Sequence, residues 1–395
     1  MTAERPLRIA MLTHSTNPRG GVVHALEVAD ALTDLGHEVS VHAPDPLGMG
    51  FFRATRCRTV PIPARLVSGD LARLVETHVA DYVSYFAAAP RERFDIYHAQ
   101  DGISANALAA LRDRGMVPGF LRTVHHIDDF ADPRLAAQQK RGIDAADRVL
   151  CVSRLWQNII ARDFGIAASR VGNGVDTARF SPASGRADAA LRARLGWGQG
   201  PVYLAVGGIE KRKNTSRILR AFLRVRQHQP AAQLVVAGGA SLLDHSAARA
   251  SFDAILRESG LAAAGEGAPV VLTGPLPDCD MPALFRLADA LVFPSLAEGF
   301  GLVVLEAMAS GTPAIVPRQA PFTEYLGEDD CLWVDPMSVD AIAAAMVGAA
   351  DPSTRRQLTA AGLDVARRHG WSAVATAHLQ IYAECLRWCR EAADA

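Results

Sequence analysis

Three absences narrow the class of protein that this 395-residue chain can be. It has no excess of charge, because 41 Lys and Arg against 42 Asp and Glu leave a net charge of −1, which argues against a dedicated nucleic-acid binder. It has no apolar run approaching the roughly 18 residues of a membrane-spanning helix. The N-terminal sequence lacks the regions of a secretory signal, so we expect a cytoplasmic protein without a transmembrane segment.

Cysteine and lysine are also scarce. The six cysteines are scattered without a CxxC pair, which favours reduced thiols over a disulfide framework. Lys140, Lys211 and Lys213 are the only lysines, and arginine supplies the other positive side chains. Two of the three lysines therefore lie within one segment of three residues.

Short apolar runs alternate with segments of helical periodicity, which predicts an α/β protein with parallel sheets. Leu7–Leu12 is typical of a buried strand, Val22–Leu35 of a helix and Glu38–Ala43 of a second strand. After a turn-rich connector, Val171–Pro182, the alternation restarts. Further strands are expected in the first half at Ile96–Ala99, Leu121–Val124 and Arg148–Val152, and in the second at Val202–Val206, Leu234–Ala237, Val270–Thr273, Ala290–Phe293 and Ala314–Val316.

We therefore expect two Rossmann-like, doubly wound domains, at residues 1–176 and 177–370. A final amphipathic segment, Trp371–Cys389, predicts a helix within residues 371–395. Two such domains would face one another across a ligand cleft, at the carboxyl ends of both sets of strands.

The segment Phe51–Phe86 is the least regular part of the first half. An amphipathic helix is expected at Asp70–Phe86. Before it, four arginines lie among apolar residues: Arg53, Arg56, Arg58 and Arg65. One interpretation is a surface for an anionic or lipid-linked acceptor, which would allow peripheral contact with a membrane. The alternative is a set of solvated loop arginines and a helix that covers the core.

Gly20 and Gly21 form a small-residue turn before the first expected helix. Backbone N–H groups at a helix N-terminus favour a diphosphate. Glycines at such a position also serve simply as tight turns, and the absence of a GxGxxG motif argues against a dinucleotide site.

A basic turn lies in Val206–Asn214, after an expected strand and before a helix that begins near Thr215. Lys211, Arg212 and Lys213 occupy it. Cations at a helix N-terminus oppose the helix dipole, so we expect an external anion to hold them. The alternative is a solvated basic turn.

The most specific segment is Glu298–Val316. Glu298 and Glu306 lie eight positions apart, with a glycine-rich turn between them and a helix expected at Leu302–Ala309. Glycines let backbone N–H groups approach a ligand closely. Two carboxylates suit a ligand with two polyols, such as a sugar and a ribose. The alternative is a dipole-stabilising acid and a solvated glutamate.

Two other segments carry possible metal ligands. Thr123–Phe130 contains His125 and His126, but adjacent histidines in an extended chain point to opposite sides, so we expect a cleft-facing or a structural His125 rather than a metal site. Asp278 and Asp280 match a DxD pattern, for which helix N-capping is the favoured explanation.

Together these segments resemble the family 4 retaining glycosyltransferases of the GT-B fold over nearly the whole chain. The resemblance implies that residues 1–176 form the acceptor-side domain, that residues 177–370 bind the nucleotide sugar, and that the helix within residues 371–395 packs back on the N-terminal domain. The glutamate pair with its glycines is the most specific match. The matching pieces occur in the family's order: GGVVHALEVADAL, HAQD (His98–Asp101), TVH (Thr123–His125), NGVDTARF (Asn173–Phe180), the basic turn, PSLAEGFGLVVLEAMASGTPAI and WSAVATAHLQIY.

The resemblance implies a role for each matching residue. Gly21 and Lys213, with Arg212 beside them, would bind the donor diphosphate. Glu298 would lie near the donor sugar, and Glu306 would hold the ribose hydroxyls. The remaining implied contacts are the backbone amides of Phe300, Gly301 and Leu302 at the donor, His125 at the sugar, Leu276 in the nucleobase loop Thr273–Pro277, and Asp101 at the acceptor.

Two departures from the family's pattern are visible. Where the family usually has an arginine of the donor site, in a VGR pattern, this chain has Gly208, so the phosphate site would depend on Lys213 and Arg212. The connector before Asn173 is also short, which affects the expected hinge.

The resemblance implies an enzyme that moves a sugar from a nucleotide diphosphate sugar to a hydroxyl acceptor, with retention at the anomeric carbon. It implies no divalent metal and no cofactor, so that the donor and the acceptor are the expected partners. Two other classes stay open: a nucleotide-sugar epimerase of the same architecture, and a sugar-nucleotide-binding module without catalysis.

Overall fold

The computed structural model describes residues 5–88, 92–239, 245–262 and 267–394, with side chains up to residue 387. The chain divides into two compact units. Unit 1 comprises Met1–Asn173 and Trp371–Ala395, so it is built from two separate segments of the sequence. Unit 2 is the continuous segment Gly174–Gly370.

Unit 1 contains a seven-stranded parallel sheet with the order β3-β2-β1-β4-β5-β6-β7. Its inner strands are almost wholly buried, and most of their residues are apolar. The strand order reverses between β1 and β4, as in a doubly wound sheet. The strands are β1 (Arg8–Leu12), β2 (Glu38–Asp45), β3 (Arg58–Pro63), β4 (Ile96–Ala99), β5 (Leu121–Val124), β6 (Arg148–Cys151) and β7 (Ser169–Arg170).

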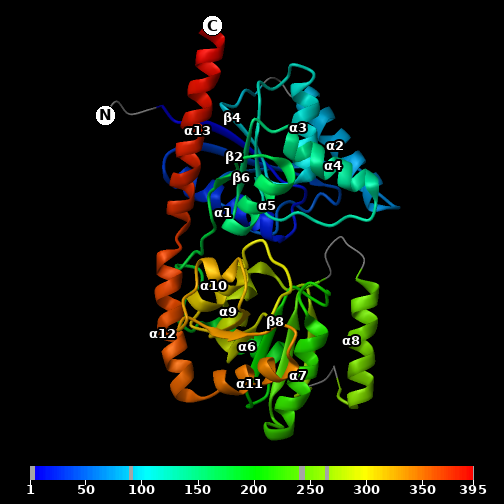
Figure 1. Cartoon of the computed structure of the whole chain (residues 1–395), viewed down its shortest axis with the longest axis vertical. Coiled ribbons are helices and arrows are strands. Elements are labelled where there is room, and N and C mark those ends of the chain that lie inside the picture. Colours follow the sequence, from blue (N-terminus) through cyan, green and yellow to red (C-terminus); the bar gives the residue numbers. More distant parts are fainter. Residues whose placement is uncertain (1–4, 89–91, 240–244, 263–266, 395) are drawn as a thin grey trace. The chain divides into compact units, whose positions relative to one another are not determined.

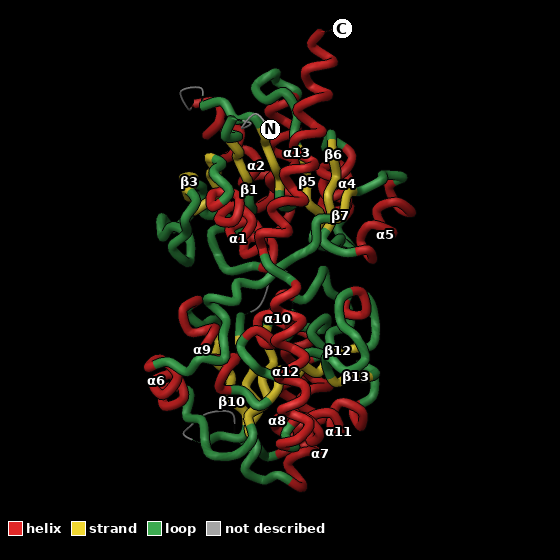
Figure 2. Tube along the Cα trace, turned by 90° about the vertical axis from the view of Figure 1, so that its left-hand side faces the viewer, coloured by secondary structure: helices red, strands yellow, loops and turns green. Residues whose placement is uncertain are grey.

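The helices of unit 1 cover this sheet (Figures 1 and 2). Side chains of α2 and α3 pack on β1 and β4 in one apolar cluster, and α13 packs against α1. Ser153 caps α5 by accepting a hydrogen bond from Trp156 N, as its sequence position suggests. The helices are α1 (Gly20–Asp34), α2 (Leu71–Ala88), α3 (Gly102–Arg112), α4 (Pro133–Asp144), α5 (Arg154–Phe164) and α13 (Trp371–Asp394).

Unit 2 contains a six-stranded parallel sheet with the order β10-β9-β8-β11-β12-β13. The order reverses between β8 and β11. Alternate side chains of β8 enter opposite apolar clusters, because successive residues of a strand face opposite sides of the sheet. The strands are β8 (Val202–Val206), β9 (Gln233–Ala237), β10 (Val270–Gly274), β11 (Ala290–Val292), β12 (Ala314–Pro317) and β13 (Leu332–Val334).

Helices cover both faces of this second sheet. Side chains of α7, α8 and α11 pack on one face, and those of α6, α9, α10 and α12 pack on the other. The helices are α6 (Arg186–Arg194), α7 (Thr215–His228), α8 (Ser246–Ser259), α9 (Met281–Leu287), α10 (Leu302–Ala309), α11 (Val339–Ala349) and α12 (Pro352–Arg368), with short 3-10 turns η1 (Asp278–Asp280) and η2 (Phe322–Glu324).

The sequence located most of these elements. The expected strand Leu121–Val124 is β5 and the expected helix Leu302–Ala309 is α10. The first helix begins at Gly20, so Gly20 and Gly21 are helical residues rather than a turn before the helix. Three strands were not expected, namely β3, β7 and β13, each of which lies at the edge of its sheet.

Two sequence-based expectations about the whole chain can be compared with the described residues. Within them, no helix combines the length and the apolar character needed to cross a membrane. No disulfide links the cysteines whose side chains are described: Cys57, Cys151, Cys279, Cys331 and Cys385.

Candidate active site

Two cations meet one carboxylate at the carboxyl edge of the sheet in unit 2. Lys213 Nζ and Arg212 Nη1 each donate a hydrogen bond to Glu298 Oε1, both at 2.8 Å. The side chains of Lys213 and Glu298 are largely buried, whereas that of Arg212 is partly exposed. The Lys213 ammonium also lies 4.3 Å from the centre of the Phe293 ring. The fold thus joins two of the segments that the sequence analysis singled out separately.

A second carboxylate, Glu210, contributes to this cluster. Its Oε2 lies 3.3 Å from Arg212 Nη2, and its Oε1 lies 3.5 Å from His245 Nε2. In the structure, carboxylates of the chain hold two of the three cations, Arg212 and Lys213, and the external anion that we expected at this helix start stays a prediction. An anion that binds here competes with Glu298 and Glu210, or uses the other donors of the Lys213 ammonium, which has three.

The charges of this cluster depend on one another. Burial lowers the pKa of Lys213, and the negative charge of Glu298 opposes that shift. Burial acts to raise the pKa of Glu298, but Lys213 and Arg212 hold it below its usual value. Glu298 is therefore ionised at neutral pH and acts only as a hydrogen-bond acceptor.

The turn that carries Lys213 has an unusual backbone. Gly207 and Gly208 follow β8 with φ values of +112° and +74°, and Asn214 has a φ of +61°. A Cβ atom at Gly208 would lie 2.8 Å from the carbonyl oxygen of Gly239, a contact that real Cβ atoms do not make. This backbone therefore excludes the arginine that the family usually has at position 208.

The N-terminus of α10 follows directly in the loop that contains Glu298. Gly301 precedes the helix with a φ of +95°, and a Cβ atom there would lie 2.7 Å from the Phe322 ring. No side chain caps this helix end. The first amides of the helix, from Leu302 onward, therefore point out of it at the positive end of the helix dipole.

Other residues expected at the donor surround this loop or follow β10. The Phe300 ring stacks on Tyr325 at 4.6 Å, and the Tyr325 hydroxyl donates to the Phe300 carbonyl oxygen at 3.3 Å. Glu306 is half-buried in α10. Leu276 packs against the apolar core of unit 2, in the loop after β10.

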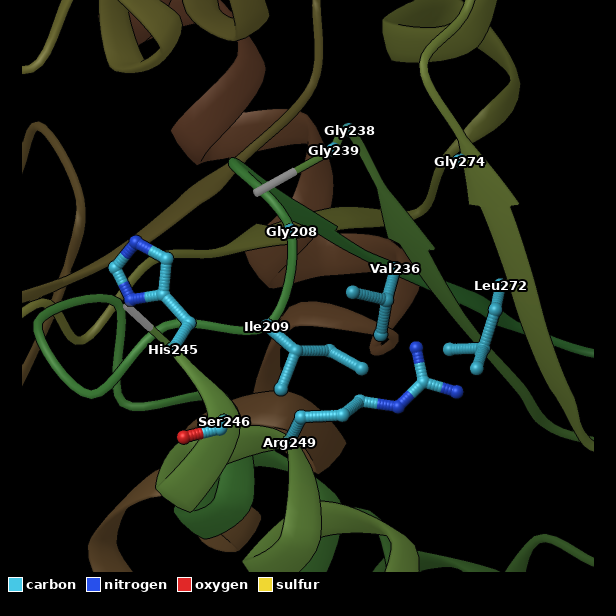
Figure 3. A pocket seen from close by; sticks show the side chains of 10 residues that line it. All are labelled: Gly208, Ile209, Val236, Gly238, Gly239, His245, Ser246, Arg249, Leu272 and Gly274. Atoms are coloured by element: carbon cyan, nitrogen blue, oxygen red, sulfur yellow. The ribbon is translucent and has the colours of Figure 1, made fainter. Parts of the chain in front are cut away.

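A pocket of about 370 Å³ opens at the carboxyl ends of β8, β9 and β10. Figure 3 shows the side chains of Ile209, Val236 and Leu272 on one side of it, with the Arg249 guanidinium directed toward Leu272. Of the expected donor residues, Gly208 lines this pocket, and Lys213 is not among its lining residues. The lining consists of Gly208, Ile209, Val236, Gly238, Gly239, His245, Ser246, Arg249, Leu272 and Gly274.

In unit 1, the structure brings Gly21 and His125 together. A Cβ atom at Gly21 would lie 3.1 Å from Cδ2 of His125, so the imidazole ring packs directly on the start of α1. His125 Nε2 lies 3.0 Å from Gln100 Oε1. Burial lowers the pKa of His125, which keeps the ring neutral.

Further buried histidines lie behind His125. The His24 ring is 4.7 Å from that of His125, and a hydrogen bond of 2.6 Å joins His24 Nδ1 and Asn173 Oδ1. His98 contacts the Tyr382 hydroxyl of α13 at 2.7 Å. Burial lowers the pKa of His24 to about 3 and the pKa of His98 well below its usual value. This wall of unit 1 is therefore uncharged at neutral pH.

Asp101 has a structural role in unit 1. It is the N-cap of α3, where Oδ1 accepts a hydrogen bond from Ser104 N at 2.9 Å and the Ser104 hydroxyl bonds back to Asp101 N. Its other oxygen lies 3.5 Å from His14 Nδ1. Burial acts to raise the pKa of Asp101, but His14 and Ser104 hold it below its usual value. A role at the acceptor stays a prediction for this residue.

The possible metal ligands have other partners. His126 Nε2 lies 3.2 Å from Asp128 Oδ2 on an exposed loop. Asp278 pairs with Arg179 at 2.7 Å, and Asp280 pairs with Arg194. The N-capping explanation for Asp280 was wrong, because its side chain makes no capping bond to α9. Among the described residues, no group of three or more His, Cys, Asp and Glu side chains could hold a metal ion.

Sequence reasoning missed several residues of these two edges. Glu210 lies within the basic turn and Gln100 within the HAQD motif, so the sequence analysis covered both positions. It did not predict the side chains with which they interact. Phe293 and Tyr325 carried no local signal, since an isolated aromatic residue is more often part of a core.

Both halves of the chain match family models. Residues 18–179 match the model described as Glycosyltransferase Family 4, and residues 188–362 match the model described as Glycosyl transferases group 1. A GDP-mannose-dependent alpha-(1-6)-phosphatidylinositol monomannoside mannosyltransferase from Mycolicibacterium smegmatis is 30% identical over 91% of this chain and 92% of its own length. A D-inositol 3-phosphate glycosyltransferase from Salinispora arenicola is 28% identical over 97% of this chain and 93% of its own length.

Solved structures support the same fold. Sucrose-phosphate synthase from Thermosynechococcus elongatus aligns with a TM-score of 0.77 and 22% identity, covering 97% of this chain and 100% of that one. The Anabaena protein HepE, solved with UDP and glucose, aligns with a TM-score of 0.74 and 17% identity, covering 96% and 99%.

The two parallel sheets, with the residue clusters at their carboxyl edges, define a GT-B protein with two Rossmann-like units. The chain belongs to the family 4 glycosyltransferases, and it is a transferase of glycosyl groups.

Proposed function

We propose that this glycosyltransferase uses a nucleotide diphosphate sugar as donor and a hydroxyl group as acceptor, with retention of configuration and without a divalent metal. The observation that carries the proposal is the buried Lys213–Glu298 pair beside Arg212 and the uncapped start of α10. The name of the mycolicibacterial relative includes GDP-mannose, and the HepE structure was solved with UDP and glucose, which supports a donor of this class.

In the proposed reaction, the bond between the anomeric carbon and the diphosphate breaks while the acceptor oxygen bonds to that carbon. The acceptor proton passes to the released diphosphate. Lys213, Arg212 and the α10 dipole would stabilise the negative charge that develops on the leaving group, as preorganised electrostatics. These cations would take the place of a metal ion at the phosphates.

Glu298 would orient the sugar and steady positive charge at the anomeric carbon. Both cations bind its Oε1 atom, and this ion pairing lowers the basicity of the carboxylate. We therefore assign it no covalent role. His125, which is neutral, would contact a sugar hydroxyl, and Gly21 would leave room for the diphosphate at the start of α1.

The proposal is tested with a panel of nucleoside diphosphates and their sugars. A bound ligand raises the melting temperature according to its occupancy, which identifies the donor. With that donor and hydroxyl acceptors, we expect nucleoside diphosphate release that depends on the acceptor and an NMR signal of retained configuration. Transfer should continue in EDTA.

Three results would contradict parts of this proposal. Inverted product stereochemistry would refute retention. Activity that is lost in EDTA and restored by manganese would refute metal independence. Conversion of the donor to an epimer without nucleotide release would favour the epimerase class instead.

A further inference from the structure

Gln100 is a buried residue of unit 1 to which the proposed reaction gives no role. It follows β4, and its backbone N–H donates to the carbonyl oxygen of Leu12 in β1 at 2.9 Å, so the end of the sheet fixes its position. The residue is only 2% exposed. Its Oε1 atom lies 3.0 Å from Nε2 of His125, the imidazole that we place at the donor sugar. Gln100 therefore contacts the site through His125 and not directly.

The side-chain amide of Gln100 is only half satisfied. Within the part of the chain that the structure describes, its nitrogen is buried and has no hydrogen-bond partner. A buried donor without a partner is costly. A half turn of the amide exchanges its oxygen and its nitrogen, which have nearly the same shape. Because the amide nitrogen makes no bond in the present arrangement, no described contact of that nitrogen holds the amide against such a turn.

The two arrangements of the amide correspond to the two neutral forms of the His125 ring. When the amide oxygen faces the ring, the ring proton is on Nε2 and Nδ1 is an acceptor. When the amide nitrogen faces the ring, it donates to a bare Nε2, and the ring proton is on Nδ1, which then donates. His125 is partly exposed, and Nδ1 is the ring nitrogen that Gln100 leaves for a ligand.

The surroundings of His125 keep the ring in place and neutral in both forms. Its contacts with the start of α1 at Gly21 and with the His24 ring do not depend on which nitrogen carries the proton. Burial lowers the pKa of His125, and four basic side chains lower it further: His24 in α1, His98 in β4, Arg122 in β5 and the adjacent His126. A carboxylate at position 100 would only accept and would favour a charged ring, so an amide suits two neutral forms.

We propose that Gln100 is a positioning residue: by turning its amide, it lets His125 present either a donor or an acceptor at Nδ1 to a hydroxyl group of the substrate. A sugar hydroxyl also donates and accepts, so the contact can persist while the hydroxyl turns during transfer. A ligand shifts the two forms only by as much as it binds one of them better. The contact with a hydroxyl rests on the proposed function, whereas the exchange of the two forms rests on the geometry of unit 1.

The first test is NMR of the full chain with isotope-labelled histidine nitrogens, whose shifts show which ring nitrogen carries a proton. The signals of His125 are those that disappear in His125→Asn. Without ligand, we expect signals of both neutral forms, separate or averaged. GDP-mannose and UDP-glucose are then added in turn, and the one that binds should move His125 toward one form. His98, held by the hydroxyls of Tyr382 and Thr123 at 2.7 and 2.8 Å, should not change.

Two variants of Gln100 sharpen the test. In Gln100→Glu, a carboxylate among basic side chains only accepts, so the ring proton should stay on Nε2 and added nucleotide sugar should not move it. In Gln100→Met, the ring loses its partner, and kcat/KM for transfer should fall about tenfold. The matched control is Gln157→Met, which removes the bond from the Gln157 amide to the Ala168 carbonyl oxygen at 2.8 Å and should keep kcat/KM near the original value.

Three outcomes would overturn the proposal. These are one and the same ring form in the free chain and with both nucleotide sugars, an unchanged exchange in Gln100→Glu, and equal kcat/KM in Gln100→Met and Gln157→Met. The measurement on the free, unmodified chain needs neither a variant nor a donor. A single ring form there and with both nucleotide sugars, in a chain that transfers sugar with retention, refutes the role of Gln100 alone. Exchange of both forms in a chain that transfers no sugar refutes the proposed function instead.

Discussion

The carboxyl edges of the two sheets are built from different chemistry. In unit 1, neutral imidazoles such as His125 and His24 pack on one another and on the glycine at the start of α1. In unit 2, Lys213 and Glu298 form a buried ion pair on a turn of glycines. Similar parallel sheets can therefore present either a cluster of neutral histidines or a buried ion pair at this edge, and the two clusters must respond differently to pH and to substitution.

The largest expected difference between the two units is in the stability that each loses in acid. Burial lowers the pKa of His24 and His42 to about 3 and that of His378 to about 4. A histidine in the unfolded chain has a pKa near 6.5. At pH values between this pKa and the lowered pKa of the folded state, the unfolded chain binds more protons than the folded chain, so unit 1 loses stability as pH falls below 6.5. At pH 5 the loss is about 2 kcal/mol for each histidine, or about 6 kcal/mol for the three. Hydrogen exchange at pH 8 and pH 5, followed by mass spectrometry, would measure it in peptides of α1 and α13.

Unit 2 provides the internal control for this measurement. The ion pair with Arg286 lowers the pKa of Asp188, and a lowered carboxylate pKa contributes stability that is lost only as pH falls below about 4. Peptides of α6 and α9 should therefore keep their protection at pH 5. If peptides of both units lost protection equally at pH 5, the predicted difference in acid stability between the two units would be wrong.

The next effect concerns catalysis. Replacing Lys213 by Met keeps much of the contact with Phe293 but removes the ammonium, so turnover should fall by roughly 10²–10³-fold. Nucleoside diphosphate release measures this change. Lys211→Met is the matched control, since Lys211 is exposed two positions away, and it should stay near the original rate. Similar losses in both variants would show that the general charge of the turn matters, rather than the buried cation.

A smaller effect is expected at Gly208. An alanine there has an unfavourable positive φ and a Cβ atom against a carbonyl oxygen, so unit 2 should lose about 2–4 kcal/mol in its free energy of unfolding. Denaturant unfolding measures this loss. Gly274→Ala separates the two causes, because Gly274 has a φ of +64° and no neighbouring atom within 4 Å of its Cβ position. It should lose only about 1–2 kcal/mol. Equal losses would remove the steric argument against an arginine at position 208.

The smallest effect on stability is expected at Gly21. A Cβ atom there meets a side chain that can shift, so Gly21→Ala should change the free energy of unfolding by no more than about 1 kcal/mol. The same change should move His125 by a few tenths of an ångström and slow transfer. Gly20→Ala is the neighbouring control, with nothing within 4 Å of its Cβ position. Identical transfer rates for the two variants would show that Gly21 does not contribute to the active site.

The sequence predicted the buried inner strands better than most strands at the sheet edges. β8 and β5 were located to the residue, because β8 is an apolar run that ends at Gly207 and β5 ends before the polar residues His125 and His126. β3 was missed because it contains Pro61 and Pro63 and pairs on one side only, at the sheet edge. β7 and β13 have two and three residues, too few for a periodic signal.

The sequence identified residues of the candidate site but did not show which of them pair with one another. Lys213 and Glu298 were each identified from a local pattern, yet each was assigned to a ligand. Their mutual hydrogen bond depends on loops after two neighbouring strands, β8 and β11, whose adjacency no local sequence window contains. For the same reason, composition did not show the ion pairs of the arginines near β3, namely Arg53–Glu27, Arg56–Asp34, Arg58–Glu92 and Arg65–Asp81.

The two-segment construction of unit 1 affects how the protein is made. A growing polypeptide emerges from the ribosome in order, so all of residues 174–370 emerge before Trp371. Unit 2 can therefore complete its core during synthesis, while unit 1 lacks α13 and the Tyr382 partner of His98 until residues 371–382 have emerged. A nascent chain that stalls before these residues emerge would have a finished second unit and an open first one, which a chaperone or protease would recognise by its exposed apolar surface.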